Sequence, residues 1–170
     1  MKENHLNFKV LIFWLGFAVI TIIFLVLFGI RVFKVSTFKD IDDVKRANLV
    51  IKGAITTQKE DEYYVYLYSS KDHDSNYAYQ EVEPTIFTYF TYVAKNGNND
   101  TVKIYAYDVD SFTSMYGYNN VNDYLNSLNN NLKTSSLPSL VKISNGGVNS
   151  TFTTINKITG ELQNMMTDSK

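Results

Sequence analysis

YYVYLYSSKDHDSNYAYQEVEP, residues 63–84, and SSLPSLVKISNGG, residues 135–147, are the two stretches that decide the fold. The first begins with aromatic and β-branched residues that are apolar on both faces, as in a strand covered on two sides. A polar loop follows, and apolar residues then recur at helical spacing through residues 77–95, around Pro84. The second stretch ends in Asn-Gly between two apolar runs, which predicts a hairpin with a two-residue turn.

Apolar spacing also predicts the remaining elements. We expect a short amphipathic helix at residues 41–47, a strand at 49–55, a second buried strand at 102–109 and helices at 111–133 and 155–166. The succession of strand, helix and strand across residues 63–109 predicts a right-handed parallel crossover. The sequence therefore predicts an α/β domain that ends in an antiparallel hairpin and a helix.

An uncharged apolar run, VLIFWLGFAVITIIFLVLFGI, occupies residues 10–30. As a helix rising about 1.5 Å per residue it is roughly 31 Å long, about the thickness of a hydrocarbon core. The run is longer than the apolar part of a signal peptide, and no small-x-small cleavage site follows it. We predict a short N-terminal flank at 1–9, an uncleaved transmembrane helix at 10–30, a juxtamembrane linker with a helix at 31–48, and a domain at 49–170.

The order of these elements and three local features resemble those of membrane-anchored bacterial thioredoxin-like proteins. The strand YYVYLYS resembles the strand that leads into the family's redox loop, and EVEP, residues 81–84, resembles its proline-containing helix. Residues 135–147 resemble its cis-proline strand and hairpin. The resemblance covers residues 49–166 and implies a thioredoxin-like fold, a central mixed sheet flanked by helices, with a cis bond between Leu137 and Pro138.

The family's CxxC motif has two possible registers in this chain. Counting back from Pro84 places NYAY, residues 76–79, at the motif, whereas counting forward from Tyr68 places DHDS, residues 72–75, there. Neither contains cysteine, and the whole chain has none. Thiol–disulfide exchange is excluded in both registers, because it needs an attacking thiolate and a leaving sulfur.

The charge of the chain indicates mainly which kinds of partner it can bind. The net charge is −1, the pI is about 6.1 and no run of basic residues occurs, so we expect no nucleic-acid partner. Lys2 and Lys9 before the apolar run nearly balance Arg31, Lys34 and Lys39 after it, so the basic residues do not fix the membrane orientation. The resemblance implies a single-pass protein of the cell membrane with its domain outside the cytoplasm.

The resemblance also implies a binding surface, made by Asn76, Tyr77, Tyr79, Leu137 and Pro138. In the family the residue before the cis-proline offers its backbone to an extended peptide, and the two tyrosines would add contact area at low entropy cost. We therefore expect a redox-inactive accessory module, chaperone-like or complex-stabilising, that binds a secreted or membrane protein. The alternative is a structural subunit of a membrane complex, held mainly through its transmembrane helix; in both cases we expect no catalytic residue, metal or cofactor.

Two acidic groups have alternative interpretations. Asp72-His73-Asp74 could bind a metal or supply a general base, but adjacent side chains diverge, and we expect a solvated loop. Asp108 and Asp110 end the second central strand, where ligands approach α/β sheets. We expect them to cap the turn that follows.

Overall fold

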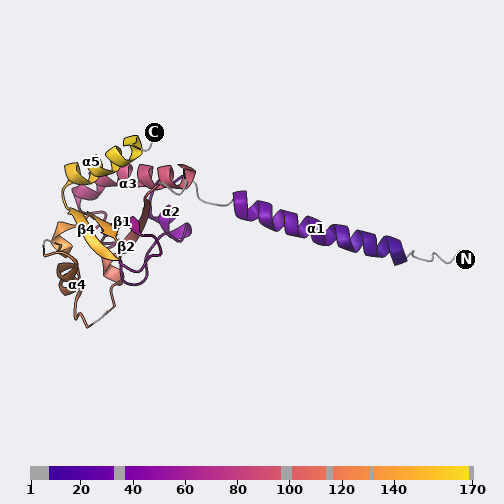
Figure 1. The fold of residues 1–170 in the computed structure, drawn as a ribbon, viewed down its shortest axis with the longest axis horizontal. Helices are drawn as coiled ribbons and strands as arrows, with labels where there is room; N and C mark the ends of the chain where they lie inside the picture. Colours follow the sequence, from indigo (N-terminus) through magenta and orange to yellow (C-terminus); the bar gives the residue numbers. More distant parts are fainter. Residues whose placement is uncertain (1–7, 33–36, 97–100, 114–116, 131, 169–170) are drawn as a thin grey trace, which may run out of the picture. The chain divides into compact units, whose positions relative to one another are not determined.

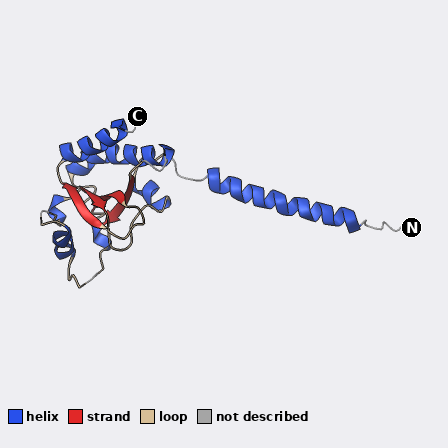
Figure 2. Cartoon of the chain, in the orientation of Figure 1, coloured by secondary structure: helices blue, strands red, loops and turns tan. Residues whose placement is uncertain are grey.

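A computed structural model describes residues 8–32, 37–96, 101–113, 117–130 and 132–168. The chain divides into two compact units, residues 1–34 and 35–170. The first contains one helix, α1, which spans Phe8–Val32. The second is an α/β domain, whose strands form one sheet with helices around it (Figure 2).

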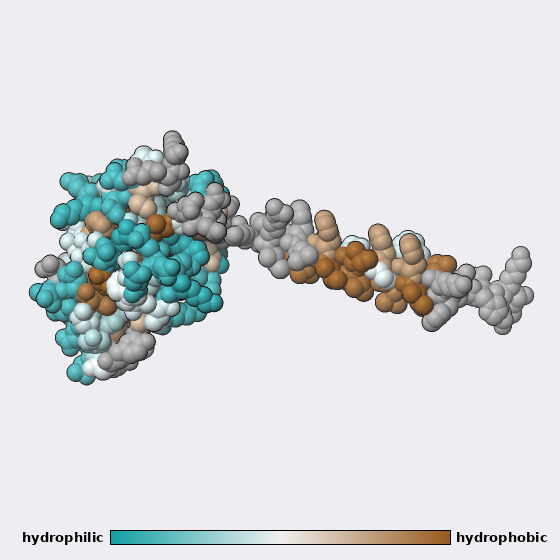
Figure 3. All heavy atoms as spheres, viewed as in Figure 1, coloured by the Kyte–Doolittle hydropathy of each residue, from teal (hydrophilic) through white to brown (hydrophobic). Residues whose placement is uncertain are grey.

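The described side chains of α1, at residues 10–26, are exposed and almost all apolar (Figure 3). Within the part of the chain that the structure describes, no helix combines the length and apolarity that crossing a membrane requires.

Figure 1 shows the elements of the second unit in order along the chain. They are α2 (Ile41–Arg46), β1 (Glu62–Tyr68), α3 (Tyr77–Asn96), β2 (Lys103–Asp108), the short 3-10 helix η1 (Val109–Ser111), α4 (Val121–Leu128), a second 3-10 helix η2 (Thr134–Ser136), β3 (Ser139–Ser144), β4 (Gly147–Phe152) and α5 (Ile155–Asp168).

The sheet has the strand order β2-β1-β3-β4. β1 pairs in parallel with β2 and antiparallel with β3, and β3 pairs antiparallel with β4. The expected parallel crossover through α3 and the terminal hairpin are thus confirmed. The hairpin turns at Asn145 and Gly146, whose φ angles of 51° and 73° match the two positive values of the turn type that Asn-Gly favours.

Both faces of β1 are covered, as its continuous apolar pattern predicts. On one face, α3 and α5 lie side by side, and the hydroxyls of Tyr64 and Tyr66 bond to Glu161 of α5 and Glu83 of α3. On the other face, the hydroxyl of Tyr63 donates to the carbonyl of Ile55 at 2.8 Å. All six residues of β1 from Tyr63 to Tyr68 are buried, so this strand is the centre of the core.

Three sequence-based boundaries are wrong. Residues 49–55 do not form a strand: only an isolated bridge joins Val50 to Ala106 of β2. The helix expected at 111–133 is confined to α4, which Asn120 caps by accepting from the amide of Asp123; residues 114–116 and 131 lie outside the described part. The domain also starts before residue 49, because Phe38 and Val44 belong to its core.

Candidate functional site

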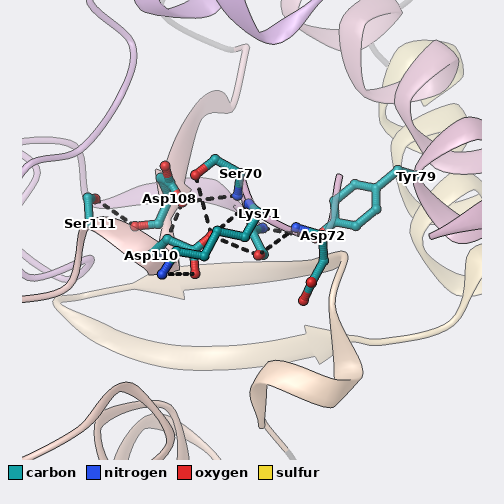
Figure 4. Close-up of polar contacts among 8 residues, drawn as sticks. Ser70, Lys71, Asp72, Tyr79, Asp108, Asp110 and Ser111 are labelled. Atoms are coloured by element: carbon teal, nitrogen blue, oxygen red, sulfur yellow. Dashed lines mark hydrogen bonds and ion pairs between the residues drawn. The ribbon is translucent and has the colours of Figure 1, made fainter. Parts of the chain in front are cut away.

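The candidate site lies where β1 and β2 end and α3 begins. Residues 69–76 connect β1 to α3, and we call them the 69–76 loop. Polar contacts fasten this loop to the end of β2, and Figure 4 shows them around Asp108 and Asp110. Leu137 and cis-Pro138, which precede β3, approach the other end of the loop.

Asp110 holds the first half of the loop. Its Oδ2 accepts from Ser69 Oγ at 2.8 Å and from the backbone N–H of Lys71 at 2.9 Å, with a longer bond of 3.3 Å from Ser70 Oγ. Burial alone would raise the pKa of Asp110, but the bonds from Lys71 and Ser69 outweigh it and lower that pKa below the ordinary value. The carboxylate is therefore an internal fastening of the loop.

Asp108 performs the expected capping role. Its Oδ1 accepts from the backbone N–H of Asp110 at 3.0 Å, at the start of η1, and from that of Ser70 at 3.3 Å. Both aspartates at this edge of the sheet thus satisfy backbone donors. Capping was predictable from the sequence, whereas the attachment of the loop to Asp110 was not.

His73 is not the solvated residue that we expected. Its Nε2 lies 2.8 Å from Oε1 of Glu83 and its Nδ1 lies 3.1 Å from Oδ1 of Asp74. The ring packs against Tyr79 with 5.1 Å between ring centroids, and its side chain is only 29% exposed. The expectation fails because α3 places a buried carboxyl group beneath the loop.

That carboxyl group belongs to Glu83 of the EVEP motif, whose burial the sequence did not predict. Glu83 is buried, and its Oε1 also accepts from the hydroxyl of Tyr66 at 2.9 Å. Burial and the adjacent Glu83 raise the pKa of Tyr66 well above its ordinary value. The sequence does contain a sign of this burial. Glu83 lies on the apolar side of a helical pattern, next to Val82 and between Tyr79 and Ile86.

Asn76 joins the start of α3 to the cis-proline segment. Its Oδ1 accepts from the backbone N–H of Ala78 at 3.0 Å, and its Nδ2 donates to the carbonyl of Leu137 at 3.3 Å. The residues of NYAY therefore occupy the position immediately before α3 and its first turn, while those of DHDS lie in the turn before it. Asn76 and Leu137, predicted as parts of one site, are brought together.

The two tyrosines of NYAY point in different directions. Tyr77 is 66% exposed, and a hydrogen bond with Glu81 raises the pKa of its hydroxyl. Tyr79 is 1% exposed, its hydroxyl accepts from the backbone N–H of Ser69 at 2.9 Å, and burial raises its pKa to about 12. The expectation that Tyr79 supplies contact area is wrong, because its side chain is part of the core.

The peptide bond between Leu137 and Pro138 is cis, as expected. Both residues are buried, and the backbone of Leu137 is already engaged. Its N–H donates to the carbonyl of Thr134 at 3.3 Å, and its carbonyl accepts from Asn76. A peptide that docks on this backbone must therefore compete with two internal hydrogen bonds.

Within the described residues, no group of three or more histidine, aspartate or glutamate side chains has the geometry to hold a metal ion. The arrangement offers instead a fastened loop, an exposed aromatic side chain at Tyr77, and the junction of Asn76 with the Leu137 carbonyl. These are features of a contact surface. Comparisons with protein-family models, with curated proteins and with solved structures each gave no match.

Proposed function

We propose that this chain is a membrane-anchored, cysteine-free thioredoxin-like protein whose domain is a binding or accessory module for a secreted or membrane protein. The observation that carries the proposal is the junction of Asn76, which directly precedes the exposed Tyr77 in the chain, with the Leu137 carbonyl before cis-Pro138. Thioredoxin-like domains bind their substrates at this position, and in this chain the position contains no cysteine.

The strand arrangement supports the thioredoxin-like assignment. In that fold a strand, helix and parallel strand are followed by an antiparallel hairpin and a helix, with a cis-proline before the first hairpin strand. The order β2-β1-β3-β4, the helices α3 and α5, and the cis bond at Pro138 agree with each of these features. The start of α3 favours NYAY as the register of the former motif.

The binding surface that we propose is centred on the side chain of Tyr77. Among the described residues of the domain, Tyr77 is the one large apolar residue that is exposed. Aromatic side chains of this kind contribute much of the energy at protein interfaces and lose little entropy on binding. The Leu137 carbonyl adds one backbone acceptor, for which a bound peptide would compete with Asn76.

The membrane anchor is proposed from the sequence. Residues 10–30 carry no charge, and lipid is the solvent in which such a segment is stable as a helix. We place the domain outside the cytoplasm by analogy with membrane-anchored thioredoxin-like proteins. The apolar, exposed side chains of α1 also favour a second candidate, a structural subunit that binds a membrane complex mainly through this helix.

Site-specific photo-crosslinking in native membranes separates the two candidates. A photoreactive amino acid would replace Tyr77 in one sample, Phe24 of α1 in a second, and exposed Lys157 of α5 in a third as a matched control. The accessory-module proposal predicts one protein crosslinked from position 77 and not from 157. Capture from position 24 alone would favour the structural subunit, and equal capture from 77 and 157 would refute a specific surface at Tyr77.

A further inference from the structure

His73 connects the 69–76 loop to the buried interior of the domain. One ring nitrogen faces the exposed carboxylate of Asp74, and the other faces Oε1 of Glu83 on α3. The same Oε1 accepts from the hydroxyl of Tyr66 on β1. A titratable ring at the surface is thus joined through one oxygen atom to the central strand.

The two contacts of the ring place different demands on its protonation. Both ring nitrogens face carboxyl oxygens, at 2.8 and 3.1 Å, and a neutral imidazole has only one N–H. If the ring is neutral, one of its nitrogens presents a lone pair to an oxygen atom. Only the protonated ring, which carries an N–H on each nitrogen, donates to both Asp74 and Glu83.

The groups around His73 are carboxylates, which favour its positive charge, and tyrosines, which carry no positive charge that would repel it. α3 contributes Glu83 and the ring of Tyr79, β1 contributes Tyr66 through Glu83, and the loop contributes Asp74. Among the described residues, none of the contacts of His73 is with a lysine or arginine. Burial of the ring lowers the pKa of His73, but the hydrogen bonds and charges of Asp74 and Glu83 outweigh burial and raise it above the ordinary value.

We propose that His73 is a pH-dependent latch that, when protonated, fastens residues 72–76 to α3 through Glu83, while Asp74 holds the ring from within the loop. The latch is complete at a pH below the ordinary histidine pKa of about 6.5 and weakens as the pH rises through the higher value of the folded protein. This inference does not depend on the proposed partner binding.

The latch acts on a defined part of the loop. Residues 69–71 stay attached to Asp110, whose carboxylate is ionised throughout this pH range. Beyond them, the backbone N–H groups of Ser75 and Asn76 both donate to the carbonyl of Asp72, at 3.2 and 3.1 Å. These two amides report opening of the segment that His73 holds.

NMR of the full chain in detergent micelles tests the latch. The chain has two histidines, so His73 is assigned by comparison with His5→Gln, which also serves as the matched control. We expect His73 to titrate above the ordinary histidine value of about 6.5, and Glu83→Gln to lower the pKa of His73. We also expect amide exchange of Ser75 and Asn76, corrected for its intrinsic pH dependence, to rise about fivefold across that titration, the difference between a charged and a neutral hydrogen bond.

A second variant keeps the test decisive if Glu83→Gln disturbs the core. His73→Gln retains a polar side chain at the surface but cannot be protonated, so Ser75 and Asn76 should exchange at the faster rate at every pH. The proposal is overturned if His73 titrates at the ordinary value of about 6.5, or if the corrected exchange of the wild-type loop does not change across the titration.

Discussion

Replacing Asp110 with alanine tests whether the 69–76 loop is fastened to the end of β2 as described. The substitution removes the acceptor for Ser69 Oγ at 2.8 Å and for the Lys71 backbone N–H at 2.9 Å. The side chain is 20% exposed, so water replaces these bonds only in part. At about 1.5 kcal/mol for each bond to a charged acceptor, the free energy of unfolding should fall by about 3 kcal/mol.

Thermal unfolding of the full chain, followed by the near-ultraviolet circular dichroism of its tyrosines, measures this loss. For a domain of this size, about 3 kcal/mol corresponds to a decrease in Tm of about 10 °C. Asp61→Ala, at an exposed aspartate just before β1, is the matched control and should change Tm little. If Asp110→Ala behaves like Asp61→Ala, the fastening contributes nothing and our account of the loop is wrong.

The same carboxylate gives the effect a pH dependence. The pKa of Asp110 is lower in the folded protein than its ordinary value of about 3.9. A depressed carboxyl pKa contributes stability that is fully present above the unfolded value and is lost as the pH falls through the folded value. The difference in Tm between wild type and Asp110→Ala should therefore be constant near neutral pH and shrink below about pH 4.

Three further predictions concern the core and the hairpin. Tyr66→Phe removes the donor to Glu83 and should lower the free energy of unfolding by about 1–3 kcal/mol, measured by urea denaturation. Tyr107→Phe removes a buried hydroxyl that has no hydrogen-bond partner among the described residues, so the same assay should show no loss or a small gain; a loss like that of Tyr66→Phe would mean that this hydroxyl is bonded. Asn145→Ala keeps a β-carbon at a φ of 51° but loses the short polar side chain that tolerates this conformation, and should cost about 1 kcal/mol, whereas Asn145→Gly should be nearly neutral; equal losses from both would contradict the turn described.

The central strand β1 and the hairpin were predictable because their signals are local. Tyr63–Tyr68 is apolar on both faces, and only a strand between two layers buries both. Asn145-Gly146 supplies the positive φ values that a two-residue hairpin turn needs. These stretches specify their own conformation, and the structure agrees with them to within a few residues.

The helix expected at 111–133 was overestimated for an equally local reason. Its apolar residues do recur at helical spacing, but Asn120 and Asn129 are also good capping residues. Asn120 accepts from the amide of Asp123 at 2.9 Å and starts α4, while Asn129 is extended and ends it. Spacing alone does not distinguish an asparagine within a helix from one at its boundary.

The contacts of the loop could not be predicted, because they join residues far apart in the chain. Asp110 meets Ser69 only because β1 and β2 end side by side, and Asn76 meets Leu137 only because β3 lies next to β1. Which of Tyr77 and Tyr79 is exposed depends on the residue at which α3 begins. The sequence did not determine that residue, because the NYAY and DHDS registers place it differently. The resemblance predicted that Asn76 and Leu137 would meet, and the packing of α3 decided which of the two tyrosines is exposed.

The most direct test of the account is the recovery of the partner by a Tyr77→Ala variant of the full chain. The protein crosslinked from position 77 would be co-purified from native membranes with wild type, Tyr77→Ala, Tyr77→Phe and the control Lys157→Ala. Because Tyr77 is exposed, its replacement leaves the core intact, and an interface anchor of about 2 kcal/mol predicts roughly thirtyfold weaker binding for Tyr77→Ala. We expect Tyr77→Phe and Lys157→Ala to recover the partner like wild type; equal recovery by Tyr77→Ala would contradict a binding surface centred on this residue.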